Sequence, residues 1–357
     1  MFPYLAMLAL PAIFALATPK RAGLLLLLVA VIYWLMIGFR YQVGMDWYNY
    51  ANLYLYEQRI PWADIPARRE PAFVLLNRVA GWVGGGPILV DAVSAAVFMA
   101  GLYAVARRCR EPMLAVVVAT PMLVVGLAMS GIRQAIALGI IFVLFARWER
   151  HGTLARTLFV FLASLFHFSA IFVLIYVALA SRAQPVVKAV GLLLVGAILL
   201  FMARYKLEAV EAYSRLYIGA EHKLSAPGAI IQIAPIALAG LLYLVFRRAW
   251  ARVNGDNPLD RTLAWSSLLI APLVPFTSVG AYRFALYFWP FAMGVWAGAP
   301  ALIESGTGRL FYRLVVLVVA FAMLVGWLLF ANNSSAWLPY QSWLLQPAGA
   351  PIWRHGR

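Results

Sequence analysis

Long apolar runs dominate the chain, and short polar segments separate them. A helix that crosses a bilayer needs about 20 predominantly apolar residues to pass about 30 Å of hydrocarbon. Runs near that length predict about ten transmembrane helices, at residues 1–17, 22–39, 88–106, 112–129, 131–147, 186–203, 228–246, 262–279, 283–298 and 310–331. We therefore expect an all-α, polytopic integral membrane protein, with one integrated membrane domain over residues 1–357.

A further apolar stretch, residues 155–180, carries His167 and Ser169 near its centre. Short loops rich in Lys and Arg stay on the cytoplasmic side of a membrane. A single crossing here would place the basic segments "SRAQPVVK" and "RRAWAR" outside. A re-entrant helix pair that breaks near His167 removes this conflict, because non-helical backbone is tolerated at membrane depth where protein or water surrounds it. Both interpretations stay open.

The re-entrant interpretation predicts two longer periplasmic loops, at residues 40–86 and 204–227, and a periplasmic C-terminal tail at 332–357. The tail sequence "NNSSAWLPYQSW" is typical of a segment whose aromatic side chains lie among the lipid headgroups. The formal net charge is +16. With no soluble basic domain to carry it, this charge favours cytoplasmic loops rather than nucleic-acid binding.

Four arginines fall at predicted outer helix ends or in the first outer loop: Arg40, Arg69, Arg133 and Arg283. An arginine at a helix end can simply extend its side chain to the headgroups, which is the ordinary interpretation of Arg40. Arg133 follows "MSG" at the start of a span, where a charge is costly and commonly functional. The planar guanidinium matches phosphate oxygens, so several arginines in one cavity favour a ligand with several negative charges.

Three titratable groups accompany these arginines. Asp46 follows Gly44, which permits a tight turn back toward the same cavity. Glu70 precedes Pro71, so it is a candidate helix cap as well as a candidate acid or base. His167 can exchange a proton near neutral pH. As the general base we favour Asp46 or Glu70 over His167.

Neighbouring polar side chains complete the predicted site. Tyr50 offers a surface for stacking against a sugar and a hydroxyl group, and Gln134 lies beside Arg133. The chain has no nucleotide-binding G-x-x-x-x-G-K-[ST] loop and no G-x-S-x-G turn. Its histidine spacing does not suit a metal, and Cys109 is its only cysteine. We expect no cofactor and no metal site.

Five segments occur in an order that resembles a known family: "FRYQVGMDWYNY", "REPAFVLLN", "GIRQAIALGIIFVLFARWER", "LASLFHFSAIFVLI" and "YRFALYF". From about Arg40 to Phe288 the chain resembles the EpsG family of Wzy-type polysaccharide polymerases. The resemblance implies a GT-C class glycosyltransferase in the bacterial inner (cytoplasmic) membrane, with its active site facing the periplasm. It implies a role in the synthesis of exopolysaccharide, capsule or O-antigen.

Such an enzyme joins undecaprenyl-diphosphate-linked oligosaccharide repeats by transferring the growing chain from its lipid diphosphate to a sugar hydroxyl of the incoming repeat. For such a reaction we expect Asp46, Glu70 or His167 to remove the hydroxyl proton. We expect Arg133 and Arg283 to hold the donor diphosphate, and Arg40 and Arg69 to hold the same or the acceptor diphosphate. The predicted substrate-binding residues are Arg40, Tyr50, Arg69, Arg133, Gln134 and Arg283. A chain-length regulator is a possible partner. Alternatives are an O-antigen ligase, a membrane O-acyltransferase, and a non-enzymatic exporter or flippase of lipid-linked oligosaccharide.

Overall fold

The computed structural model describes residues 1–17, 23–180, 228–274 and 278–346, together with short helical pieces between 185 and 197. Within these ranges the regular structure is helical, apart from an isolated β-bridge between Arg40 and Ser342. The predicted all-α class is confirmed. The predicted loop at 204–227, and much of the predicted span at 186–203, lie outside the described residues.

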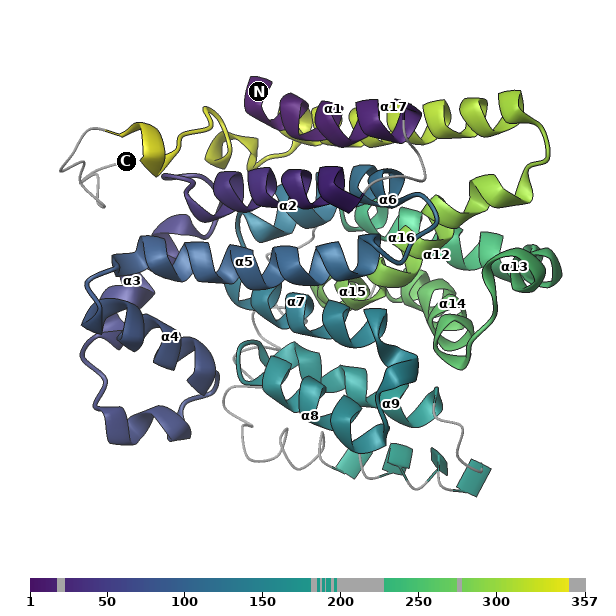
Figure 1. Cartoon of the computed structure of the whole chain (residues 1–357). Helices are drawn as coiled ribbons and strands as arrows, with labels where there is room; N and C mark the ends of the chain where they lie inside the picture. The colour runs from purple at the N-terminus through teal and green to yellow at the C-terminus, as the bar shows by residue number, and fades with distance from the viewer. Residues whose placement is uncertain are drawn as a thin grey trace.

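The helices pack side by side around a continuous apolar core (Figure 1). The first half of the chain forms α1 (Phe2–Ala17), α2 (Gly23–Gly38), α3 (Trp47–Glu57), α4 (Pro71–Trp82), α5 (Gly86–Ala106), α6 (Pro112–Ala119), α7 (Ile132–Ala146), α8 (Thr153–Ser164) and α9 (Leu174–Leu179). The second half forms α12 (Ala229–Val245), α13 (Arg247–Asn254), α14 (Pro258–Ile270), α15 (Ser278–Ala285), α16 (Trp289–Gly298) and α17 (Gly306–Phe330).

Among the described residues, two helices, α5 and α17, are long and apolar enough to cross a membrane. A third span results if α12 and α13, which meet at 90°, are counted as one. These helices indicate an integral membrane protein. About ten spans are not shown, because several apolar runs are divided into shorter helices. After α6, for example, the backbone continues as a π-helix, η2 (Thr120–Ala128), with Pro121 in its first turn.

α5 and α7 form the central pair, and their backbones approach closely. Val90 shares a small apolar cluster with Ile132 near the first turns of the two helices, so α5 and α7 run in parallel. Halfway along, a Cβ atom added to Gly139 would lie 2.4 Å from the main-chain oxygen of Val97. A Cβ on Gly101 would lie 2.3 Å from the oxygen of Gly139. This pair of glycines lets the two helices touch along their main chains.

Gly139→Ala is therefore expected to destabilise the fold, since both contacting atoms belong to rigid helix backbone. Gly294→Ala in α16 is the matched control, because a Cβ at Gly294 meets no atom within 4 Å. Alanine is favoured over glycine in a helix by up to about 1 kcal/mol, so the control should be neutral or stabilising. Thermal unfolding in detergent measures both. Equal melting temperatures for the two variants would contradict the close packing.

The described part of the C-terminal tail packs against the bundle, so Trp337 is not one of the headgroup aromatics that the sequence predicted. Trp337 is only 2% exposed, and its indole Nε1 donates to the main-chain oxygen of Val125 at 3.0 Å. Tyr4 donates to the main-chain oxygen of Trp337 at 2.6 Å. Further along, the main-chain NH of Trp343 donates to the oxygen of Phe39. Burial of a large aromatic residue with its polar atom paired outweighs a place among the headgroups.

The apolar stretch at 155–180 breaks where the sequence predicted. α8 ends at Ser164, the backbone of His167 is extended, and a 3₁₀ helix, η4 (Phe168–Val173), leads into α9. Both η4 and α9 pack against α8. The break places His167 beside the start of α4, while the re-entrant path through a bilayer stays a prediction.

Candidate functional site

Glu70 is positioned by the turn between η1 (Trp62–Ala67) and α4. Pro71 occupies the first turn of α4, where a missing NH costs nothing. Glu70 precedes it, with φ −130° and ψ 68°, but its side chain does not cap the helix. Instead the carboxylate extends to α7 and η4. Its side chain is 8% exposed.

Glu70 links two other predicted site residues. Its Oε2 accepts a hydrogen bond from Nη1 of Arg133 at 2.5 Å. Its Oε1 lies 3.0 Å from Nδ1 of His167 and accepts from the main-chain NH of Phe168 at 3.2 Å. Arg133 and His167 follow Glu70 in the chain by 63 and 97 residues. We name Glu70, Arg133 and His167 the charged cluster.

The electrostatics keep Glu70 ionised. Burial opposes the negative charge, but the hydrogen bond to His167 and the charge of Arg133 outweigh it and lower the pKa of Glu70 to about 2. An ionised carboxylate only accepts hydrogen bonds, so Nδ1 of His167 must carry the proton of this contact. In neutral His167, Nε2 is then the nitrogen with a free electron pair.

Arg133 combines its ion pair with aromatic contacts. Its guanidinium lies 5.6 Å from the ring centre of Tyr50 and 6.0 Å from that of Phe73, a distance at which cation–π attraction operates. Arg133 remains 37% exposed, whereas His167 is 14% exposed. The cluster is thus held by packing while the guanidinium stays accessible.

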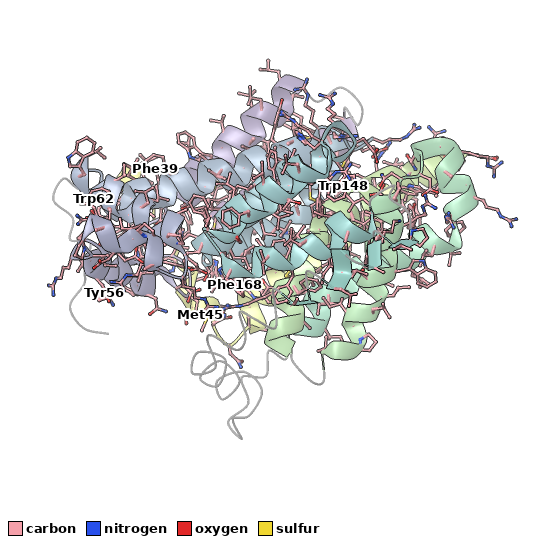
Figure 2. The ribbon with its side chains drawn as sticks, turned by 90° about the horizontal axis from the view of Figure 1, so that it is seen from below. Phe39, Met45, Tyr56, Trp62, Trp148 and Phe168 are labelled. Atoms are coloured by element: carbon pink, nitrogen blue, oxygen red, sulfur yellow. The ribbon has the colours of Figure 1, made fainter. Side chains whose placement is uncertain are left out.

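Arg69 reaches the same region from the chain segment before α4. Its guanidinium lies 5.5 Å from the ring centre of Phe168, next to His167. In Figure 2, which views the molecule from below, Phe168 lies near the middle, and Tyr56 and Trp62 lie toward the side of α3 and η1. Two arginines, Arg69 and Arg133, therefore flank one carboxylate and one imidazole.

α15 and η6 (Leu286–Phe288) close another side of the region. The side-chain amide of Gln134 donates to the main-chain oxygen of Arg283 at 2.9 Å, which ties α15 to α7. The hydroxyl groups of Ser169 and Tyr287 lie 2.9 Å apart. Gln134 is 5% exposed. In this arrangement Gln134 positions the backbone of Arg283.

Arg40 does not join the cluster. Its side chain is 0% exposed. Its Nε donates to the main-chain oxygens of Val43 and Met129, and its Nη1 to that of Ile37 at 2.8 Å. Its Nη2 lies 3.3 Å from Oδ1 of Asp91. This placement differs from the predicted substrate contact, because the guanidinium is buried and held by three carbonyls and a carboxylate.

Asp46 lies at the start of α3 and pairs with a serine rather than with the cluster. Its Oδ2 accepts from the Ser130 hydroxyl at 3.1 Å, and its main-chain NH donates to Oγ of Ser130 at 3.3 Å. Gly44 permits the preceding turn: its φ is +104°, and an added Cβ would lie 1.9 Å from the oxygen of Met129. The predicted turn is confirmed. The main-chain oxygen of Asp46 accepts from the NH of Tyr50 on α3, whose ring lies beside the Arg133 guanidinium.

The sequence interpretation overlooked two partners. Asp91 balances Arg40, and Ser130 binds Asp46. A carboxylate inside the apolar run "PILVDAVSAAVF" was an available signal for Asp91. Ser130 carried no comparable signal. In the described part of the chain, no group of three or more His, Cys, Asp and Glu side chains is arranged to hold a metal ion.

The fold and the site together define a helical membrane protein that carries the partly exposed charged cluster at one end of its helix bundle. The chain belongs to the EpsG family, whose model matches residues 23–342. Family membership points to a role in exopolysaccharide biosynthesis. No curated protein and no solved structure matches the chain.

Proposed function

We propose that this protein is a polysaccharide polymerase that joins lipid-diphosphate-linked oligosaccharide repeats at the periplasmic face of the bacterial inner membrane. The observation that carries the proposal is the shared carboxylate of Glu70, which holds Arg133 on one oxygen and His167 on the other. This arrangement supplies, within one region, a cation for a leaving diphosphate and a base for an attacking hydroxyl.

Arg133 and Arg69 bind the donor diphosphate. Arg133 is oriented by Glu70 but stays 37% exposed, so part of its planar group can contact phosphate oxygens. As the bond from the sugar to the diphosphate breaks, negative charge grows on the leaving group. A guanidinium already fixed in place stabilises that charge without reorganisation. We assign Arg283 and Tyr50 to the sugars, since the ring centre of Tyr50 lies 5.6 Å from the Arg133 guanidinium and Gln134 ties the backbone of Arg283 to α7.

His167 removes the proton from the acceptor hydroxyl. Glu70 fixes Nδ1 as the protonated nitrogen, so Nε2 is the proton acceptor. The hydroxyl oxygen forms a bond to the anomeric carbon of the growing chain, the bond from that carbon to the diphosphate breaks, and the lipid diphosphate leaves. Glu70 is not the base, because both of its carboxylate oxygens already accept hydrogen bonds. It orients the imidazole and stabilises the charged form of His167. This assignment replaces Asp46 or Glu70 as the favoured base.

An O-antigen ligase, a membrane O-acyltransferase and a flippase remain the alternative functions. A ligase uses the same donor but a different acceptor, and a flippase forms no new bond. An acyltransferase also uses a catalytic histidine. Product length and composition separate the four, because a polymerase alone makes a series of products that differ by one repeat.

The test is a reconstituted reaction. Purified protein in detergent receives a lipid-diphosphate-linked repeat, without nucleotide or metal, and the products are separated by size. A ladder of added repeats is the expected result. Vesicle assays that show transport of the lipid-linked sugar with no ladder would overturn the polymerase in favour of a flippase.

A further inference from the structure

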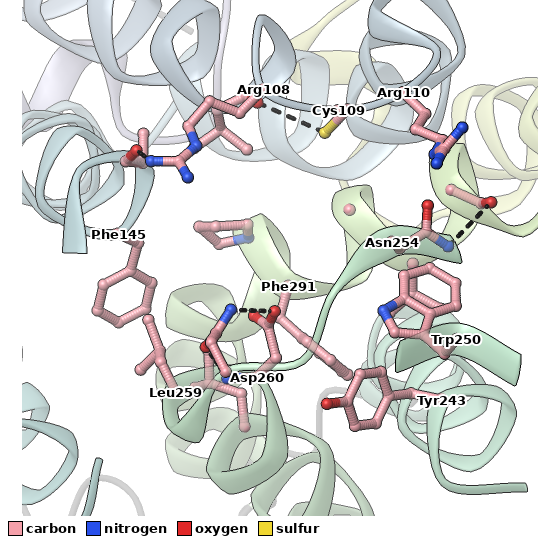
Figure 3. A pocket seen from close by; sticks show the side chains of 18 of the residues that line it. Arg108, Cys109, Arg110, Phe145, Tyr243, Trp250, Asn254, Leu259, Asp260 and Phe291 are labelled. Carbon is pink, nitrogen blue, oxygen red and sulfur yellow. Dashed lines mark hydrogen bonds between the residues drawn. The ribbon is translucent and has the colours of Figure 1, made fainter. Parts of the chain in front are cut away.

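A second polar region lies at the opposite end of the bundle, around a cavity of about 290 Å³. The turn after α5, the ends of α7 and α12, the helices α13 and α16, and the start of α14 line it. Figure 3 shows Arg108 and Arg110 on one side of the cavity and Asp260 and Tyr243 on the other. Its volume is close to the range of small-molecule sites.

The length of α5 separates this cavity from the charged cluster. α5 has 21 residues, which at about 1.5 Å per residue extend about 31 Å. The first turns of α5 and α7 lie near Arg133, whereas Val105, near the end of α5, and Phe145 line the cavity. The cavity is therefore at the other membrane face from the proposed polymerase site. In the predicted orientation that face is cytoplasmic.

The two walls of the cavity differ in chemistry. Arg108 and Arg110 are exposed cations that each donate one hydrogen bond to a main-chain oxygen, Arg108 to Ala146 and Arg110 to Val253. Guanidinium groups in such a pair suit a phosphate. Asp260 faces them, with its Oδ2 accepting from the Asn257 amide. A carboxylate there repels an anion but accepts from a neutral donor group.

Aromatic side chains form a third wall. The ring centre of Tyr243 lies 5.8 Å from that of Trp250 and 5.6 Å from that of Phe291, in edge-to-face contacts that fix all three rings. Trp250 also packs against Gly298, where an added Cβ would lie 2.7 Å from the indole. Such a fixed wall suits a flat ring.

We propose that this cavity binds a nucleotide, with its phosphate at Arg108 and Arg110, its base beside Trp250 and Phe291, and hydrogen-bond donors of the base or sugar at Asp260. A ligand with one anionic end and one neutral, donor-bearing ring fits the separation of cation and carboxylate across the cavity. The site lies far from the charged cluster, so it is a binding site distinct from the polymerase reaction.

Two features of the chain allow a sharp test. Cys109 lines the cavity and is the only cysteine, so a maleimide reports on this place alone. Cys109 is half-buried, so a ligand in the cavity shields it further, and the change in its labelling rate is the signal. Gly294 also lines the cavity, and a Cβ there meets no atom within 4 Å. Gly294→Leu therefore fills the cavity while leaving its arginines in place.

The experiment measures Cys109 labelling and thermal unfolding of the purified full chain with AMP, GMP and UMP. At ten times its dissociation constant, a bound nucleotide should slow labelling about tenfold and raise the melting temperature. Adenosine and ribose 5-phosphate should do so more weakly. Gly294→Leu should keep the wild-type melting temperature without ligand but lose the rise with nucleotide, and Arg108→Gln with Arg110→Gln should lose it too.

Three outcomes would overturn the nucleotide site. The first is the lack of any effect of the three nucleotides at about 1 mM, a concentration at which a site with a micromolar dissociation constant would be filled. The second is an equal rise in melting temperature in wild type and Gly294→Leu. The third is protection of Cys109 in nanodiscs of anionic lipid without nucleotide, which would assign the cavity to a lipid headgroup.

Discussion

Glu70→Gln is expected to lower the rate of chain extension by about a hundredfold or more, because the variant loses the orientation of the base His167, and a positioned base usually contributes that much. Glutamine keeps the size of the side chain but removes the charge that orients His167 and pairs with Arg133. Without that charge neither the protonated nitrogen of His167 nor the position of the guanidinium is fixed. The measurement is the rate of repeat addition by equal amounts of folded protein, with the pH profile of kcat/KM.

Glu57→Gln is the matched control. Glu57 is also a buried carboxylate near the cluster, but it accepts from the side-chain amide of Asn77 at 2.6 Å, and glutamine can still accept there. Burial raises the pKa of Glu57, so the surroundings stabilise the negative charge of Glu57 less than that of Glu70. Glu57→Gln should extend chains at nearly the wild-type rate. Equal losses in both variants, or a Glu70→Gln profile with unchanged pH dependence, would remove the role assigned to Glu70.

Arg40→Ala is expected to reduce folded protein rather than to remove substrate binding. Truncating one member of a buried ion pair leaves the other charge uncompensated, which costs about 3–5 kcal/mol. Here the charge left behind is Asp91, and three main-chain oxygens also lose their donor. The yield and the melting temperature in detergent should both fall markedly.

The double variant Arg40→Met with Asp91→Leu separates structure from function. Replacing both members of a buried pair by apolar side chains is often neutral for stability. The double variant should therefore regain much of the stability and extend chains at a rate near that of wild type. A double variant that folds but makes no polymer would restore Arg40 as a substrate-binding residue, as the sequence alone predicted.

The comparison of Arg40 with Arg133 shows how far sequence reasoning reached. Both were predicted as phosphate-binding cations at helix ends, and the sequence did not separate them. The difference lies in long-range packing: Asp91 is 51 residues from Arg40 and neutralises it inside the bundle. Arg133 instead meets Glu70 at the edge of the bundle and keeps part of its surface exposed.

The break at His167 was predictable because a polar group in an apolar run conflicts with continuous burial. The pairing of His167 with Glu70 was not, since it depends on η4 packing back against α8 and toward the start of α4. Helix boundaries also departed from the apolar runs. The run at 262–279 ends as helix α14 at Ile270, just before a proline at 272. Hydropathy indicates which residues favour lipid over water, whereas the ends of a helix are set by backbone geometry, as at a proline.

The most direct test of the polymerase is the fate of the lipid diphosphate during one coupling. Two lipid-linked repeats, one with a labelled sugar and one with a labelled lipid, are mixed with purified protein. The account predicts one released lipid diphosphate for each repeat joined by wild type, and neither product from folded Glu70→Gln. Joining of repeats by Glu70→Gln at the wild-type rate, or movement of intact lipid-linked sugar without release, would contradict it.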